Sequence, residues 1–160
     1  MFNINVICVG KLKEKYLKDA IDEYSKRLSK YCDLKIIEIQ DEVIPDKVND
    51  KIAQEIKSKE AAKIISNIKK DAYVICLDLK GKEMTSVEFS EKIDNIKVNG
   101  YNNVTFIIGG SLGIGNEVIE ICKEKICFSK MTFPHQLFRV FLLEQLFRGF
   151  KISNNEKYHL

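Results

Sequence analysis

The sequence predicts a single α/β domain in which a mostly parallel sheet carries helices on both faces. Apolar, strand-like runs alternate with helical segments five times along the 160 residues, which is the order that βα units with parallel strands produce. The runs over residues 72–77 and 104–108 are continuously apolar, as strands buried on both faces are. No repeat or linker divides the chain, so we expect one domain over residues 1–160.

The composition is typical of a folded globular protein and excludes several other classes. Hydrophobic residues make up 45% and charged residues 31% of the chain, whereas disordered chains contain fewer apolar residues and a larger net charge. No apolar run approaches the roughly 20 residues of a membrane span, and the N-terminus lacks the basic region of a signal peptide. We therefore expect a cytoplasmic protein.

Five cysteines are present, and no two have the C-x-x-C spacing of a zinc site. Because only His135 and His159 could add further ligands, we expect no metal. The odd number of cysteines and a cytoplasmic setting argue against a disulfide framework. Cys8 and Cys76 lie in apolar runs, so both are expected to be small buried hydrophobes.

The first half of the chain contains two strand–helix units. Short β-rich runs alternate with segments whose apolar residues recur at three- and four-residue steps, the period of one helical face. In order, these patterns predict a strand over 3–9, a helix over 11–28, a strand over 34–39, a polar loop over 40–50 and a helix over about 51–69.

The second half continues the alternation. Thr85-Ser-Val-Glu88 is a capping box, so a helix opens there. In order, the patterns predict a strand over 72–77, a helix to about 98, a strand over 104–108, a glycine-rich bend over 109–115, a helix over 116–123, a strand over 126–128, a loop over 129–134, a helix over 135–150 and a polar tail over 151–160.

The glycine-rich bend is the first candidate binding element. Ligands of parallel sheets bind beyond the carboxyl ends of the strands, which here lie at Val9, Leu77, Ile108 and Phe128. The bend after Ile108 exposes backbone amides to a ligand. Its spacing satisfies neither G-x-G-x-x-G nor the P-loop pattern. It is therefore either a backbone-lined pocket of another kind or a tight turn between a strand and a helix.

Two C-terminal segments are unusually apolar. Residues 128–135, Phe-Ser-Lys-Met-Thr-Phe-Pro-His, lack a helical period and form a loop that must pack on the core, a partner or a ligand. The helix over 135–150 is apolar around nearly its whole circumference, as a helix buried all round is. At the end of a domain this size we expect a subunit interface, with a central core helix as the alternative.

Charged side chains of this last helix fall into two kinds. Glu144 and Arg148 are four residues apart in the favourable order, so we expect a structural ion pair. Arg139 has no such partner in its helix and lies among apolar residues. An unpaired cation there is costly, which makes Arg139 a functional candidate.

The net charge of +3 lies entirely in residues 129–160, because the preceding residues are balanced. This excess either attracts a polyanion or is a basic tail without a partner. Tyr158 and His159, close to the end, could stack on a base or hold a phosphate. A frayed and inert tail is the alternative.

Taken together, these motifs resemble one known family. They are Gly10-Lys-Leu-Lys, Leu77-Asp, Ile108-Gly-Gly-x-x-Gly113, Phe128-Ser-Lys-Met-Thr-Phe-Pro-His-Gln136, Arg139, Glu144-Gln-x-x-Arg148 and Tyr158-His159. From end to end the chain is similar to the RlmH family, ribosomal RNA large subunit methyltransferase H. The resemblance implies a SPOUT fold, an α/β domain whose C-terminal stretch forms a deep trefoil knot, and a homodimer that packs the knotted regions together.

The resemblance also implies an activity and a set of site residues. Family members use S-adenosylmethionine, without a metal, to methylate N3 of a pseudouridine in 23S rRNA of the assembled ribosome. By motif position, the cofactor site comprises Leu77, Gly109, Phe128, Ser129, Lys130, Met131, Thr132 and Phe133. The family tail usually ends in a basic residue, whereas this chain ends in Leu160, which removes any phosphate contact from that position.

The reaction implied is an in-line displacement in which the protein handles charge and a proton. As hypotheses, Arg139 stabilises charge on the carbonyl oxygens of the base, and His135 or His159 accepts the proton. Tyr158 and His159 close over the base from the partner subunit. The modest charge predicts poor activity on naked RNA. The rivals are a non-catalytic ribosome-binding factor on the same fold and a small-molecule enzyme using a nucleotide, which the failed glycine spacings disfavour.

Overall fold

Five strands form one sheet in the order β2-β1-β4-β3-β5, and every neighbouring pair is parallel. The structure is a computed structural model that describes residues 1–160. The parallel sheet expected from the sequence is therefore confirmed. The strands are β1 (Asn3–Val9), β2 (Asp33–Ile39), β3 (Tyr73–Lys82), β4 (Asn103–Ile108) and β5 (Glu124–Ile126).

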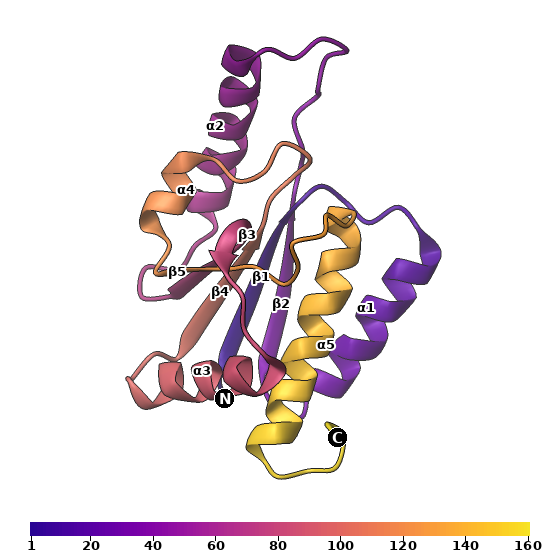
Figure 1. Ribbon diagram of the computed structural model, residues 1–160, viewed down its shortest axis with the longest axis vertical. Coiled ribbons are helices and arrows are strands. Elements are labelled where there is room, and N and C mark those ends of the chain that lie inside the picture. Colours follow the sequence, from indigo (N-terminus) through magenta and orange to yellow (C-terminus); the bar gives the residue numbers. More distant parts are fainter.

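Helices cover both faces of this sheet, as expected (Figure 1). On one face α5 packs against both α1 and α3, and on the other α2 packs against α4. None of the helices combines the length and apolar character that crossing a membrane requires. The helices are α1 (Lys15–Leu28), α2 (Asp50–Ser66), α3 (Ser86–Val98), α4 (Asn116–Ile121) and α5 (His135–Ser153).

The continuous apolar runs are explained by two separate cores. Successive side chains of a strand point to opposite faces, so Val6 and Cys8 of β1 join the core beneath α1, α3 and α5. Ile7 and Val9 join the core beneath α2 and α4. Successive residues of these strands are therefore all apolar, because neither face of the central strands meets water.

Several boundaries differ from the predicted ones. The helix expected from residue 11 begins at Lys15, because the preceding residues are irregular and the Leu12 N–H donates to Glu38. The third strand continues to Lys82, and its register with β5 shifts after Leu77. The last strand covers Glu124–Ile126, two residues earlier than predicted, since Glu124 already pairs with Ile75 of β3.

One prediction about the cysteines is confirmed and another is wrong. Cys8 and Cys76 are both fully buried, as expected for small hydrophobes. Cys76 also forms a disulfide with Cys122, although no disulfide was expected. The two residues meet because Cys122 ends α4, which packs over the face of β3 that carries Cys76. Their separation of 46 residues hides this approach from sequence spacing.

Candidate functional site

A cavity of about 450 Å³ lies beyond the carboxyl ends of β4 and β5 and beside Leu77, Asp78 and Leu79 of β3. The bend after Ile108 forms one wall, and the segment between β5 and α5 forms the other. These are the two segments that the sequence singled out. The volume of the cavity falls within the range of about 300–1,000 Å³ that is typical of small-molecule sites.

Six of the eight residues expected at the cofactor site line this cavity. They are Leu77, Gly109, Phe128, Ser129, Thr132 and Phe133. Lys130 and Met131 do not line it. The Met131 side chain is 73% exposed, and Lys130 Nζ points to Glu83, 3.6 Å from its carboxylate. Ser129 Oγ accepts the Met131 N–H at 3.0 Å, which turns the chain outward at these two residues.

The glycine bend brings backbone rather than side chains to the cavity wall. Gly110 and Gly113 face each other in an isolated β-bridge, which folds the bend back on itself. A Cβ atom on Gly109 would lie 2.7 Å from the Ile114 side chain and 2.9 Å from the Gly113 backbone, closer than real Cβ atoms approach. The bend therefore depends on the missing side chain, and its surface presents peptide groups.

His135 is the one titratable candidate that lines the cavity. It opens α5 and is half-buried. Burial lowers the pKa of its imidazole, and the nearby Arg139 guanidinium lowers it further against an opposite effect of Asp41. A lowered pKa keeps the ring neutral at pH 7, so one ring nitrogen can accept a proton.

Arg139 is paired, contrary to the expectation of an unpaired cation. Its side chain is 1% exposed. One terminal nitrogen donates to Glu38 at 2.6 Å and the other to the Gly10 carbonyl at 2.6 Å. Although burial raises the pKa of Glu38, the bonds from Arg139 and from the Leu12 N–H outweigh it and lower the pKa overall. Arg139 thus ties α5 to the ends of β1 and β2 and does not line the cavity.

The other C-terminal candidates lie far from the cavity within one chain. The Tyr158 ring packs edge-on against Phe147, with their centroids 5.0 Å apart, and the Arg148 guanidinium lies over the same tyrosine. His159 Nδ1 is 3.1 Å from an Arg148 nitrogen. Twelve residues of helix separate Phe147 from His135, or roughly 18 Å along the axis. The structure therefore does not bring Tyr158 or His159 to His135 in the same subunit.

Ion pairs involve four of the five basic residues of the C-terminal region, including Lys130, which lies 3.6 Å from Glu83. The predicted pair of Arg148 with Glu144 is confirmed at 2.6 Å. Lys151 pairs with Glu156 at the same distance. Since Arg139 is neutralised by Glu38 from β2, the local excess of positive charge is smaller than the sequence suggested.

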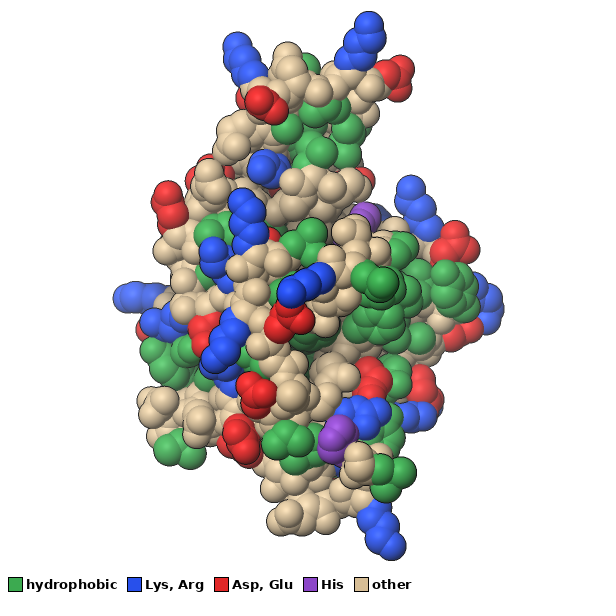
Figure 2. Space-filling model, in the orientation of Figure 1, with side chains coloured by type: hydrophobic (Ala, Val, Ile, Leu, Met, Phe, Trp, Pro, Cys, Tyr) green, Lys and Arg blue, Asp and Glu red, His purple; other side chains and the backbone are tan.

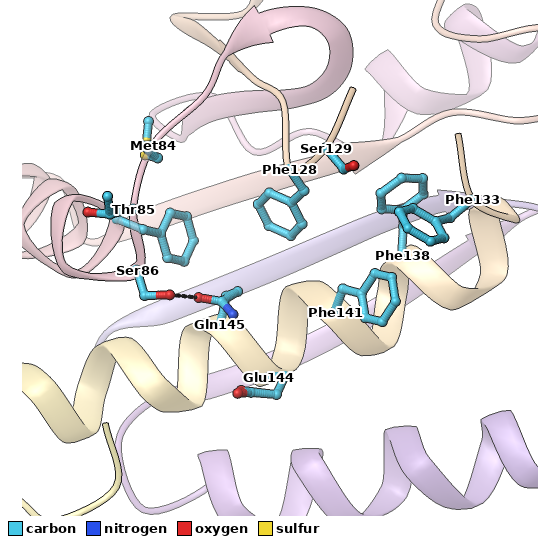
Figure 3. A pocket seen from close by; sticks show the side chains of 11 residues that line it. Met84, Thr85, Ser86, Phe128, Ser129, Phe133, Phe138, Phe141, Glu144 and Gln145 are labelled. Carbon is cyan, nitrogen blue, oxygen red and sulfur yellow. Dashed lines mark hydrogen bonds between the residues drawn. The ribbon is translucent and has the colours of Figure 1, made fainter. Parts of the chain in front are cut away.

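A second hollow of about 410 Å³ runs along the exposed side of α5. Figure 3 shows the rings of Phe128, Phe133, Phe138 and Phe141 gathered there, with Ser86 at the far end. Ser86 Oγ donates to Gln145 at 2.6 Å. Figure 2 shows hydrophobic side chains exposed on the face where α5 lies. One side of this helix is therefore uncovered in a single chain.

Sequence reasoning missed several residues at the site. Asp78 and Leu79 line the cavity just beyond the predicted end of the third strand, and their place after a carboxyl end was a usable signal. Phe138 lines it from α5, whose apolar side chains were expected to form a subunit interface. Glu38 lies 101 residues from Arg139, and no spacing rule joins such a pair.

Comparison with known proteins gives matches along nearly the whole chain. A model of the SPOUT methyltransferase family matches residues 2–159. "Ribosomal RNA large subunit methyltransferase H 1" of Clostridium perfringens (strain SM101 / Type A) is 61% identical over 157 residues, which is 98% of this chain and 99% of that protein. The enzyme of the same name without the numeral, from Clostridium botulinum (strain Eklund 17B / Type B), is 60% identical with the same coverage.

Solved structures show the same fold at low sequence identity. A probable methylase family protein from Haemophilus influenzae Rd KW20 superposes with a TM-score of 0.53 at 15% identity, covering 98% of this chain and 70% of that one. The A. aeolicus TrmH/SpoU tRNA modifying enzyme gives 0.51 at 13% identity, covering 96% and 78%. At these identities the likeness concerns the fold alone.

Proposed function

Because the chain belongs to the SPOUT methyltransferase family, we propose that it methylates the RNA of the large ribosomal subunit. The observation that carries this function is the identity of about 60% over nearly the full length of relatives named for that reaction. We also propose that residues 1–160 form one domain, whose C-terminal stretch is threaded as a knot.

We propose S-adenosylmethionine as the methyl donor, bound in the 450 Å³ cavity. The residues that line the cavity fit this donor. The bend at Gly109 supplies peptide groups that can read the edge of an adenine, and Leu77 and Phe138 supply apolar contact for its ring. When bound, the donor supplies a methyl group on a positively charged sulfur. Lys130 and Met131 contribute through the path of the loop rather than by direct contact.

We propose that the target is N3 of a pseudouridine in 23S rRNA, presented by the assembled ribosome. N3 carries a proton that must leave as the base is methylated. In this proposal His135 accepts it, which is supported by a lowered pKa that leaves the ring neutral at pH 7 and by the position of the residue in the cavity lining. Arg139 acts indirectly, since its charge helps to keep His135 unprotonated and its bonds to Glu38 and Gly10 hold the start of α5.

The working enzyme is proposed to be a homodimer that pairs the exposed sides of two α5 helices. The half-exposed rings of Phe138 and Phe141 would be covered in such a dimer. Tyr158 and His159, remote from the cavity of their own chain, would then reach the cavity of the partner and close over the target base. A ribosomal substrate places this reaction in the cytoplasm.

The test uses ribosomes from cells that lack this protein. We expect mass mapping to show one 23S rRNA pseudouridine without its methyl group, and the purified protein with S-adenosylmethionine to restore that group on intact ribosomes. Protein-free 23S rRNA should be a poor substrate. A rRNA map identical to that of wild-type cells would contradict the proposed activity. Binding to ribosomes without methyl transfer would point to the non-catalytic alternative.

A further inference from the structure

Glu60 is a buried carboxylate directly behind the glycine bend. It lies on α2 and is only 5% exposed. A Cβ atom on Gly110 would lie 3.3 Å and 3.5 Å from the two carboxylate oxygens, so the carboxylate is in contact with the backbone of the bend. Gly110 lines the large cavity with its neighbours. One residue of backbone therefore separates this charge from the cavity.

Glu60 is held in place from two directions. Its Oε2 accepts the Glu42 N–H at 3.1 Å, which fixes the carboxylate to the segment after β2. The helix itself packs on the far end of the bend, where a Cβ atom on Gly115 would lie 2.9 Å from the Lys57 carbonyl oxygen and 3.2 Å from the Ala61 side chain. The carboxylate thus has a defined position relative to the cavity.

The surroundings of Glu60 are acidic rather than neutralising. Burial raises the pKa of its carboxyl, the hydrogen bond from the Glu42 N–H lowers it, and the negative charges of Asp41 and Glu42 raise it, so that the pKa is raised overall. Lys63 acts the other way, but its ammonium lies 3.3 Å from Glu42 and is shared with that residue. Glu60 and His135 both line a small hollow behind the glycine bend. His135 carries little charge at pH 7 because its own pKa is lowered.

We propose that Glu60 is a specificity-determining residue, which makes the cavity prefer the positively charged sulfonium donor to the neutral thioether product. This inference rests on the proposed donor. The donor differs from S-adenosylhomocysteine by a methyl group and one positive charge, so a fixed negative charge behind the bend attracts the donor and not the product. At a separation on the order of 10 Å and an effective dielectric of about 20, one such charge favours the donor by a factor on the order of ten.

The decisive experiment compares the affinities of S-adenosylmethionine and S-adenosylhomocysteine by calorimetry at pH 8. Glu60→Gln keeps the shape and an oxygen for the Glu42 N–H but removes the charge. We expect it to weaken donor binding by a factor on the order of ten and to leave product binding within about twofold. Glu55→Gln, at an exposed position on the same helix, is the matched control and should change neither affinity.

Further measurements separate charge from shape. Glu60→Asp retains the charge, so it should retain the ratio of the two affinities even where both fall together. The wild-type ratio should also decline as the pH falls through the raised pKa of Glu60, because the charge is then lost. A His135→Asn background removes the imidazole, the other group beside the hollow that gains a proton in this range.

The outcomes distinguish this inference from the proposed function. A Glu60→Gln protein that weakens both ligands equally, or neither, overturns the role of Glu60 while leaving the donor site intact. If Glu60→Gln fails to fold, a wild-type ratio that does not change with pH in the His135→Asn background overturns it instead. A wild-type protein that binds neither ligand contradicts the proposed function itself.

Discussion

At the scale of single residues, Gly109 matters because of what surrounds it. An added methyl group would lie 2.7 Å from Ile114 and 2.9 Å from the Gly113 backbone, so the bend would have to open. We expect Gly109→Ala to weaken S-adenosylmethionine binding at least tenfold, on the order of 1.4 kcal/mol, as measured by calorimetry. Gly149→Ala is the control, because its Cβ would meet Ser90 at an ordinary 3.6 Å. Equal donor affinities for both variants would contradict this account of the bend.

Arg139 belongs to the same scale, and its partners define a stability prediction. Removing the side chain leaves the buried Gly10 carbonyl without its donor, whereas Glu38, which is 36% exposed, loses its cation but keeps the Leu12 N–H. We expect Arg139→Ala to lower the free energy of unfolding by about 1–3 kcal/mol, because a buried carbonyl is left unsatisfied, as measured by denaturant unfolding. Lys15→Ala, which breaks an exposed pair with Asp19, should leave that free energy unchanged within error. An unaltered stability for Arg139→Ala would show that the buried pair is not structural.

At the scale of elements, α5 combines two environments that its sequence does not separate. Leu142, Leu143 and Leu146 are at most 1% exposed, in the core beneath the helix, whereas Phe138 and Phe141 border the open hollow. The apolar circumference predicted burial on all sides, which a single chain supplies on one side only. In the proposed homodimer, a second copy would cover the remaining side.

This account of α5 predicts a change in oligomeric state. An acidic side chain on the exposed half of the helix would be buried without a partner in the dimer, a penalty of several kcal/mol. We expect Phe141→Asp to convert a dimer into a monomer in analytical ultracentrifugation. Val98→Asp, at an 84% exposed apolar position at the end of α3, should leave the dimer intact. A dimer that persists in Phe141→Asp would place the interface elsewhere.

The elements were predictable where the pattern is local, and less so where it depends on distant contacts. Alternating apolar periods identify all five strands and all five helices because burial acts on each segment separately. The strand order β2-β1-β4-β3-β5 and the extension of β3 to Lys82 depend on pairing between remote segments. For the same reason the sequence motifs predicted six of the residues that line the cavity. The Arg139–Glu38 pair and the role proposed for Glu60 depend on contacts between distant segments, which only the structure shows.

At the scale of the whole molecule, the distance between His135 and the tail is the main constraint. Tyr158 and His159 pack near the far end of α5, so one chain does not complete the proposed site. Two chains complete it if each tail serves the other subunit's cavity. The dimer would then be required for the reaction with RNA but not for binding of the donor to each cavity.

Subunit mixing tests this arrangement. A protein lacking residues 158–160 should bind S-adenosylmethionine normally and methylate ribosomes poorly, as should a His135→Ala protein with an intact tail. Mixed dimers of the two should regain up to half of the wild-type activity per dimer, since one cavity receives both an intact His135 and an intact tail. Mixing that restores nothing would mean that each tail acts on its own chain.

The central claim is that the bend after Ile108 and the segment ending at Pro134 form the wall of a methyl-donor site. A crystal structure with S-adenosylmethionine tests it most directly. The account predicts the donor between these two segments, with its adenine edge against the backbone of the bend and its sulfur within reach of the side on which His135 lies. A donor bound at any other place on the molecule would contradict it.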